Sequence, residues 1–383
     1  MALERSRPSR TLSNDELTAK AKDLALDLGA CRVGISTVET LTGGPPSTDL
    51  EYILPGARSA VTFALPLNQD KIREYLAKKD RHGHQHDYNR TNTLATGIAA
   101  QMAGYFDHFG CPSVGVLSNE VYREGDGIKR RHMIPNLSHR LLAVRCGVGW
   151  FGYSGNVMIP EFGANATLCT MVTTAELEPT EPLPAEENPC ECETKECVAV
   201  CPSSFLHVGK EDYETVTMGG VEFTYAMRRN YDRCGYVCGG YSGLHPSGRW
   251  STWSPGRFPV PKNDEDLRPV AKEAFTSWAQ RPKLDGEVLQ QPLLYQAARK
   301  DVQLTCGACM LVCAAEPEER ERRLKSVRGA GCAIQHPDGR VEVVPAEEAA
   351  KHVAAMDPDT RALYEPENPE VFDGIDMIGR ARN

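Results

Sequence analysis

The chain has 383 residues, which is more than one small domain holds, so one large or two medium-sized domains are expected. Its 41% hydrophobic and 25% charged residues are ordinary for a globular protein. The formal net charge is −9 at pH 7, from 43 basic and 52 acidic residues. Because non-specific nucleic-acid binding needs a basic surface, this balance predicts no nucleic-acid partner. No apolar run is long enough for a membrane-spanning helix, so no membrane partner is expected.

The first 176 residues mix helical and extended patterns. A helix is expected over residues 13–29, because Ser13 and Glu16 form a capping-box pattern and Gly29 suits its end. The hydrophobic pattern also predicts a second helix and three strands, at residues 91–109 and at residues 31–36, 59–65 and 166–174. This mixture predicts a compact α/β or α+β domain over residues 1–176.

The composition changes after this domain. Residues 177–189 are rich in Pro and Glu and are expected to be a linker. Residues 190–325 are irregular and rich in Cys, with an insertion at about residues 240–300 that contains a helix over 268–280. A highly charged helix is expected over 314–325, and residues 326–383 form a C-terminal extension.

The chain contains 14 cysteines, and their use depends on the compartment. Its basic opening residues are not followed by an apolar segment of signal-peptide length, so a cytoplasmic location is expected. Thiols stay reduced there, and clustered thiols usually bind metal. The scattered ones are interpreted as small buried hydrophobes or have no assigned role: Cys31, Cys111, Cys146, Cys169 and Cys332.

The other nine cysteines are candidate metal ligands. They are Cys190, Cys192, Cys197, Cys201, Cys234, Cys238, Cys306, Cys309 and Cys313. The pattern C-x3-C-P at 197–202 and the pattern C-x2-C-x3-C at 306–313 match parts of the bacterial ferredoxin run, whose last cysteine ligates the neighbouring cluster. Two interleaved [4Fe–4S] clusters are therefore predicted. Structural zinc is the alternative, because C-x2-C pairs also make zinc sites.

The glycine-rich stretch AVRCGVGWFGYSGNVMIPEFG at 143–163, ahead of two iron–sulfur motifs, resembles the superfamily of cobalamin-dependent reductive dehalogenases and epoxyqueuosine reductases. The segment LPGARSAV at 54–61 is similar to a shared early motif. The long stretch is closer to its reductive dehalogenase version. The resemblance implies an α+β fold, in which a nitroreductase-like cobalamin-binding domain precedes a ferredoxin-like domain with two [4Fe–4S] clusters.

The resemblance also implies which thiols share a cluster. Cys197 and Cys313 go to one cluster, with one or both of Cys190 and Cys192. The other cluster takes the remaining thiols of the two motifs, which are Cys201, Cys306 and Cys309. Its fourth ligand is an upstream thiol, for which Cys234 is preferred to Cys238.

The activity implied by the resemblance is that of an oxidoreductase that depends on cobalamin (a corrinoid) and iron–sulfur clusters. Its substrate is a small organic molecule, and its electrons come from an external donor such as ferredoxin or flavodoxin. Reductive dehalogenation through Co(I) is the first expectation, because residues 133–139 lack the carboxylate of the epoxyqueuosine reductases. Reduction of an epoxide or of another leaving group is the alternative. An iron–sulfur electron-transfer protein without corrinoid is the alternative from another class.

Several side chains are candidates for roles at such a site. Tyr122, Asn136 and His139 are the catalytic candidates, because reduction needs a proton donor and Tyr or His can serve. The candidate corrinoid-binding residues are Tyr88, Tyr153, Ser154, Gly155 and Asn156. An ordinary tight turn at 152–156 and purely structural hydrogen bonds are the competing interpretations. The alternating histidines of HGHQHDY at 82–88 are expected in a solvated loop, and a metal site is the alternative.

Overall fold

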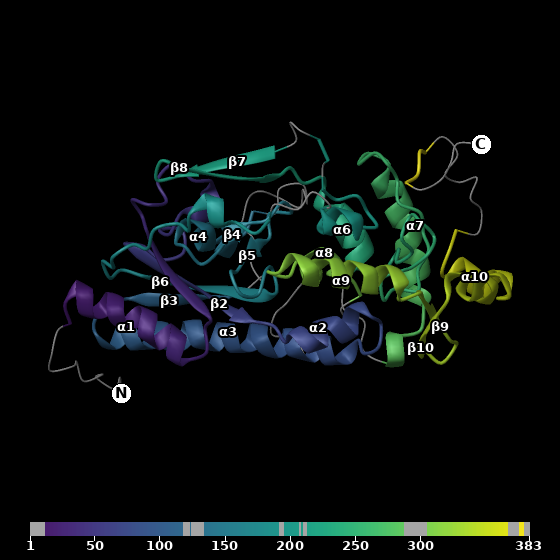
Figure 1. Cartoon of the computed structure of the whole chain (residues 1–383), viewed down its shortest axis with the longest axis horizontal. Helices are drawn as coiled ribbons and strands as arrows, with labels where there is room; N and C mark the ends of the chain where they lie inside the picture. Colours follow the sequence, from purple (N-terminus) through teal and green to yellow (C-terminus); the bar gives the residue numbers. More distant parts are fainter. Residues whose placement is uncertain are drawn as a thin grey trace.

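The computed structural model describes residues 12–117, 123, 134–190, 195–206, 208–209, 213–286, 305–366 and 375–378, apart from the side chain of residue 273. Two of the candidate residues, Tyr122 and Cys192, lie outside these ranges. The described part has mixed α/β architecture, as predicted. Figure 1 shows the sheet at one end of the molecule and the last helices and strands at the other.

Four antiparallel strands form the main sheet, in the order β1-β2-β6-β3. They are β1 (Arg32–Thr37), β2 (Ser59–Pro66), β6 (Ala166–Thr173) and β3 (Ser113–Val116). The central strand β2 pairs with β6 along its whole length and is buried except at its last residue. Its sequence SAVTFALP lacks the polar alternation of a one-sided strand, which suits a strand covered on both faces.

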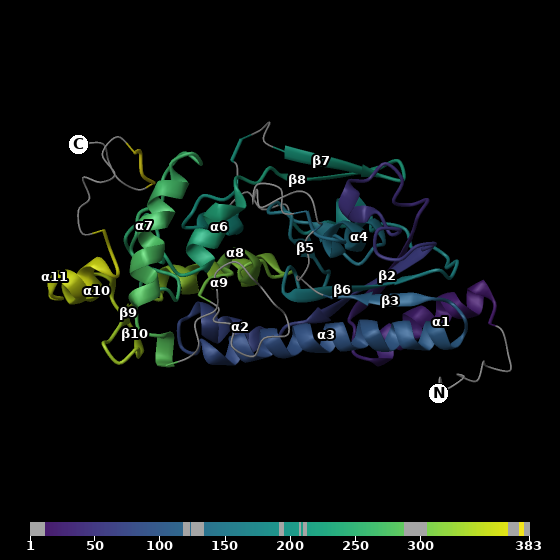
Figure 2. The same cartoon turned by 180° about the vertical axis from the view of Figure 1, so that it is seen from behind.

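Helices cover both faces of this sheet. On one face lie α1 (Asn14–Asp27) and α3 (His82–His108), whose Phe106 shares a core with Phe63 of β2 (Figures 1 and 2). On the other lies α4 (His139–Arg145), whose Leu142 packs in a second core with Val172 of β6. The predicted capping box at the start of α1 is confirmed.

Helix α3 corrects one expectation, because it begins at His82 and not near residue 91. The histidine run is therefore helical, and His84 is only 1% exposed. Its ring lies 4.9 Å from that of Tyr75, on helix α2 (Gln69–Leu76), and 6.3 Å from that of Tyr88. Burial lowers the pKa of His84 to about 4, so this side chain is a neutral part of the core at pH 7.

The remaining strands are short, whereas two of the remaining helices, α7 and α9, have 14 and 13 residues. Three two-stranded ribbons are β4 (Trp150–Phe151) with β5 (Val157–Met158), β7 (Tyr213–Met218) with β8 (Val221–Ala226), and β9 (Cys332–Gln335) with β10 (Val341–Val344). The further α-helices are α5 (Glu196–Ala199), α6 (Tyr231–Cys238), α7 (Leu267–Gln280), α8 (Ala308–Leu311), α9 (Pro317–Gly329), α10 (Ala346–Ala354) and α11 (Pro358–Ala362). Short 3-10 turns lie at Pro46–Thr48, Ala185–Glu187 and Leu284–Gly286.

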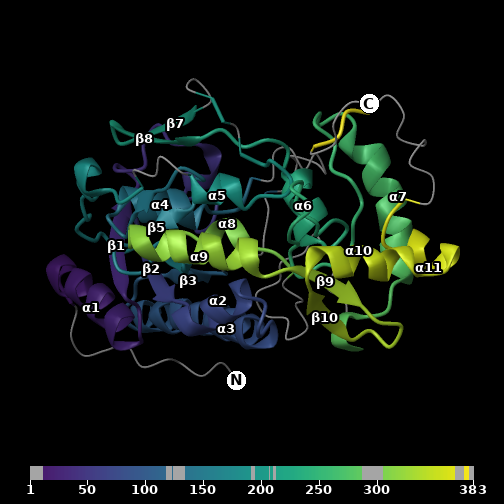
Figure 3. The ribbon, with the colours of Figure 1, turned by 45° about the vertical axis from the view of Figure 1, so that its right-hand side comes forward.

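Helix α9 lies in the middle of the molecule and packs against both α2 and α5 (Figure 3). It therefore joins the first half of the chain to the cysteine-rich half. Within the described ranges, no helix is long and apolar enough to cross a membrane.

Candidate metal centre

Eight of the nine candidate ligands fall within the described ranges, and they form two adjacent groups. The Cys313 group consists of Cys190, Cys197 and Cys313, which line one small pocket. The Cys306 group consists of Cys201, Cys234, Cys238, Cys306 and Cys309, which interact with one another. The two groups meet where Cys197 and Cys309 share an apolar cluster.

Sulfur-to-sulfur contacts hold the Cys306 group together. Helix α6 places Cys234 and Cys238 one turn apart, with 3.5 Å between their Sγ atoms. The thiol of Cys238 also contacts Cys306, and this hydrogen bond, with the N–H groups of Gly307 and Ala308, outweighs burial and lowers the pKa of Cys306 to about 7. Cys306 is thus close to forming a thiolate, which is the metal-binding form of cysteine.

Backbone groups from distant segments hold the Cys313 group. The N–H group of Tyr153 donates a hydrogen bond of 3.0 Å to Sγ of Cys190. The N–H group of Ala164 donates one of 2.8 Å to the carbonyl oxygen of Cys313. Gly163 has a φ of +62°, and a Cβ atom there would lie 2.2 Å from that same oxygen. Only glycine allows the sheet and the second cysteine motif to approach so closely.

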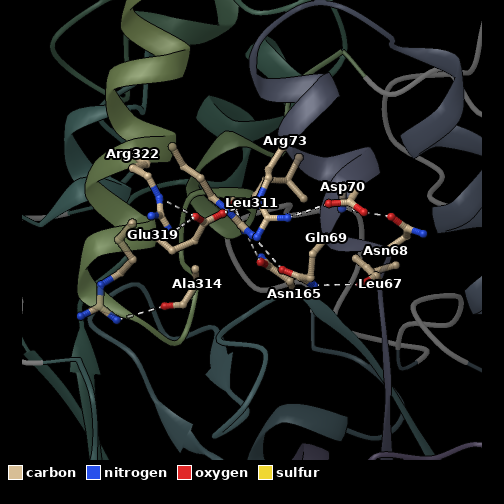
Figure 4. A network of polar contacts seen from close by, with 12 residues as sticks. Leu67, Asn68, Gln69, Asp70, Arg73, Asn165, Leu311, Ala314, Glu319 and Arg322 are labelled. Atoms are coloured by element: carbon tan, nitrogen blue, oxygen red, sulfur yellow. Dashed lines mark hydrogen bonds and ion pairs between the residues drawn. The ribbon is translucent and has the colours of Figure 1, made fainter.

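Helix α9 joins this region to the rest of the protein (Figure 4). Arg323 is only 2% exposed and donates to the carbonyl oxygen of Leu311 at 2.8 Å, next to the second cysteine motif. It also donates to Glu319 on its own helix and to Asn165 and Gln69, in the first half of the chain. One buried guanidinium therefore connects three segments far apart in sequence.

Arg320, one turn earlier, also lines the pocket of the Cys313 group. It donates to the carbonyl oxygens of Ala314 and Ala315, directly after Cys313, and to that of Pro189, directly before Cys190. These bonds fix the two ends of the group relative to each other.

Three arginines on this side of α9 share one carboxylate, and one of them, Arg73, is also paired with Asp70. Glu319 accepts hydrogen bonds from Arg73 at 2.7 Å, Arg322 at 2.9 Å and Arg323 at 2.8 Å (Figure 4). Burial acts to raise the pKa of Glu319, but these hydrogen bonds outweigh it and lower the pKa to about 2. Glu319 is therefore ionised throughout the physiological pH range.

The thiols and their surroundings fit an iron–sulfur cluster. Such clusters are bound by thiolates and are tuned by hydrogen bonds to the sulfur atoms. The N–H group of Tyr153 reaches Cys190, and that of Phe205 reaches Sγ of Cys201 at 3.4 Å. Within the described ranges, no three His, Cys, Asp or Glu side chains converge on a point suited to a single metal ion.

The candidate corrinoid-binding residues are only partly brought to this region. Tyr153 and Ser154 lie in the turn between β4 and β5 and line the pocket of the Cys313 group. Gly155 and Asn156, in the same turn, are not among the described residues that line it. A Cβ atom at Gly155 would lie 2.8 Å from the ring of Tyr225. The group that comes close to this glycine is therefore a side chain of the protein itself. Tyr88, on α3, does not line this pocket but packs against the same apolar cluster as Cys306 and Cys309.

The catalytic candidates within the described ranges lie at the start of α4. The ring of His139 has Nδ1 2.8 Å from the hydroxyl of Thr170 and donates from Nε2 to the carbonyl oxygen of Leu117 at 3.1 Å. Burial lowers the pKa of His139, so the ring is neutral at pH 7. Oδ1 of Asn136 is buried and has no hydrogen-bond partner among the described residues.

Together these features define a class: a mixed α/β protein that gathers thiols from two cysteine motifs and helix α6 into two adjacent groups beside an antiparallel sheet.

No protein-family model matches the chain. An epoxyqueuosine reductase of Bacillus cereus is 36% identical over 166 residues, which cover 42% of this chain and 39% of the relative. Another, from Gloeobacter violaceus, is 25% identical over 217 residues, which cover 49% and 60%. The chain thus spans 39% to 60% of the length of these relatives.

Solved structures of an epoxyqueuosine reductase and of a reductive dehalogenase are also similar to this chain. An epoxyqueuosine reductase bound to an epoxyqueuosine-modified tRNA stem loop has a TM-score of 0.37, with 16% identity over 60% of this chain and 59% of that one. A B12-dependent reductive dehalogenase has a TM-score of 0.45, with 16% identity over 61% and 31%. We draw no conclusion about activity from likeness at this level.

The sequence relatives confirm the predicted resemblance to the superfamily of reductive dehalogenases and epoxyqueuosine reductases. They also correct one prediction. The exclusion of a nucleic-acid partner is wrong, because an enzyme with the name of these relatives has been solved with a tRNA stem loop. A net charge of −9 is a sum over the whole chain, and it says nothing about the sign of the field at one surface.

Proposed function

We propose that this protein is a reductase that depends on two [4Fe–4S] clusters and on cobalamin, and that it works in the cytoplasm with an external electron donor such as ferredoxin or flavodoxin. The observation that carries the proposal is the gathering of eight cysteines into two adjacent groups with N–H donors aimed at their sulfur atoms. The name of the sequence relatives favours reduction of an epoxide, or of another leaving group, over the dehalogenation first expected.

The proposed ligands follow the two groups. One cluster takes the Cys313 group together with Cys192, and the other takes Cys201, Cys306, Cys309 and one thiol of α6. Cys234 is preferred for that place because it shares an apolar cluster with Cys201 and Cys309. Cys238 is then left to donate its hydrogen bonds to neighbouring sulfur atoms. The proposed division of labour places the substrate and the corrinoid on residues 1–176 and the clusters on residues 190–325.

When bound, the clusters transfer single electrons and the corrinoid supplies the reducing cobalt. This chain's own side chains then have to bind the substrate and supply protons, since removing an epoxide oxygen as water consumes as many protons as electrons. Tyr122 is proposed to supply a proton, because the ring of His139 is neutral and both of its nitrogens are already hydrogen-bonded. Asn136 is proposed to bind a polar group of the substrate, because its buried Oδ1 has no partner among the described residues. Tyr153 and Ser154 are proposed to face the corrinoid, because they line the pocket.

The substrate class follows from the relatives and not from the site. A tRNA stem loop that carries epoxyqueuosine is one candidate, by analogy with the relatives' name. A small organic epoxide and a halogenated organic molecule are the others. Arg140 and Arg228 near the Tyr153 turn add positive charge on the side of the pocket.

The test is anaerobic reconstitution of the full chain with iron, sulfide and cobalamin, followed by metal analysis and visible spectroscopy. Two clusters would bind about eight iron atoms per chain, and corrinoid bands should remain after gel filtration. The loaded protein is then offered the three substrates with a low-potential reductant. Iron without corrinoid would leave an electron-transfer protein, and zinc without iron would contradict the proposal.

A further inference from the structure

Arg228 lies beside the Cys306 group in an aromatic setting. Its guanidinium carbon is 6.0 Å from the ring centre of Phe205 and 5.9 Å from that of Tyr231. Both rings belong to the apolar cluster that contains Cys201 and Cys234. The N–H group of Phe205 donates to Sγ of Cys201, so one residue separates the cation from a candidate ligand.

The hydrogen bonds of Arg228 leave its positive charge unbalanced. Nε and Nη2 donate to the carbonyl oxygen of Ser154 at 3.0 and 2.7 Å, and Nη1 donates to the hydroxyl of Tyr231 at 2.9 Å. All of these acceptors are neutral groups. Arg228 also interacts electrostatically with a second arginine, Arg140, which donates to the carbonyl oxygen of Gly155 at 2.6 Å. Within the described ranges, no carboxylate forms an ion pair with either arginine.

Lys78 is a second cation next to the same group. Its side chain is buried, 9% exposed, and its ammonium lies 5.8 Å from the ring centre of Trp250. It interacts electrostatically with Cys306, and the described residues place no carboxylate against it. It also has a φ of +53°, which is unusual for a residue other than glycine. Burying an unpaired ammonium is costly unless an anion compensates it.

A bound iron–sulfur cluster with thiolate ligands would be that anion. Each reduction adds one electron from an external one-electron donor, without making or breaking a bond, and so adds one negative charge. Nearby cations favour the state with more negative charge, most strongly where water is excluded.

We propose that Arg228 and Lys78 raise the reduction potential of the cluster held by the Cys306 group, by stabilising its reduced form. Both are positioning residues for charge, not ligands. This inference rests on the proposed function, because it requires the cluster to be present. On the Cys313 side, Arg323 is paired with Glu319, whereas Arg320 donates to carbonyl oxygens and forms no ion pair within the described ranges.

The test uses the anaerobically reconstituted full chain and measures iron content and the midpoint potential of each cluster, by electron paramagnetic resonance and visible titration with dithionite. Arg228→Gln should shift one midpoint to lower potential by at least a tenfold change in the equilibrium constant, about 59 mV for one electron. The midpoint of the other cluster should shift less, because Arg228 interacts with Cys309 but also borders Ser154 in the pocket of the Cys313 group. Arg228→Lys, which keeps the charge, should restore most of the shift.

The matched control is Arg229→Gln, which removes the same charge one residue away. Arg229 points elsewhere and donates to the carbonyl oxygen of Lys262, so both midpoints should stay in place. Unchanged midpoints in Arg228→Gln with full iron, or an equal shift in Arg229→Gln, would overturn the inference. If Arg228→Gln loses iron, the midpoint potentials of Lys78→Gln decide instead. This variant should shift the midpoint of the same cluster to lower potential, and unchanged midpoints with full iron would overturn the inference. A wild-type chain that binds no iron would instead overturn the proposed function.

Discussion

The two thiol groups are neighbours, but they are held in different ways. In the Cys306 group the sulfur atoms contact one another, as between Cys234 and Cys238 on one helix. In the Cys313 group the contacts come from the backbone of the sheet region and from the side chain of Arg320 on α9. The difference indicates that the first group depends on local helix geometry and the second on correct docking of distant segments.

The largest expected effect separates the two groups by removing a ligand. Cys309→Ala should lose about half of the reconstituted iron, because one of two clusters would lack a thiolate. The measurement is iron per chain after anaerobic reconstitution. Cys146→Ala is the control, since that thiol is buried in the core next to α4 and should leave iron unchanged. Full iron retention in Cys309→Ala would contradict the ligand assignment.

A substitution at Gly163 should weaken the packing of the Cys313 group against the loop before β6 and so lower the free energy of unfolding. Gly163→Ala introduces a Cβ at 2.2 Å from the carbonyl oxygen of Cys313, at a φ of +62°, and should destabilise the fold by about 3 kcal/mol. Gly97→Ala is the matched control, because its Cβ would meet nothing within 4 Å and it lies inside α3. That control should be neutral or stabilised by up to ~1 kcal/mol. Urea unfolding measures both, and equal stabilities would refute the role of Gly163.

The acidic centre of the α9 network should have a smaller effect. Glu319→Gln should lower the free energy of unfolding by about 2 kcal/mol, because Arg73, Arg322 and Arg323 would lose the carboxylate that they share. Its neighbour Glu318 is exposed, so Glu318→Gln should be neutral in the same urea unfolding experiment.

The same carboxylate predicts a pH dependence. The pKa of Glu319 falls from its ordinary 4.5 to about 2 in the folded protein, so its contribution is complete above pH ~4.5 and is lost as the pH falls toward 2. Unfolding free energies measured between pH 5 and pH 2.5 should therefore decline less steeply in Glu319→Gln than in the wild type. Parallel profiles would show that Glu319 is not a linked group.

The smallest expected effect concerns the surplus thiol. Cys238→Ser should keep its iron, whereas Cys234→Ser should lose about as much as Cys309→Ala, because Cys234 is the proposed fourth ligand of the same cluster. Both variants stand on α6 and change the same atom, so each serves as the control for the other. Iron loss in Cys238→Ser alone would reverse the assignment.

Local signals predicted the first helix and three of the four strands of the main sheet, whereas the short edge strand β3 was not predicted. The strand bounds expected at 59–65 and 166–174 agree with β2 and β6 to within one residue at each end. The ribbon of β7 and β8 escaped notice, although Gly219 and Gly220 between two β-rich runs are a hairpin signal. The start of α3 was missed because HGHQHDY has no apolar periodicity, and its helical form follows from packing on α2.

The candidate site was only partly predictable. Spacing identifies the cysteine motifs, because each motif is local in sequence. The burial of Arg320 and Arg323 was not predictable, since a charged helix normally faces water and their partners are remote; Asn165 lies 158 residues from Arg323. Arg228 gave no signal, because it is one of two consecutive arginines and only the fold decides which of them faces the thiols.

The bond between Arg320 and Pro189 has a consequence for biosynthesis. These residues are 131 positions apart, so the ribosome has to add that many residues before the pocket around Cys190 can close. At cellular elongation rates this takes roughly 7 to 26 s. During that interval Cys190 and Cys197 have already been synthesised, but helix α9, which later packs beside them, has not. A nascent chain is therefore most vulnerable to oxidation or to a wrong metal before α9 has been made, and cluster insertion is expected to follow the completion of the chain.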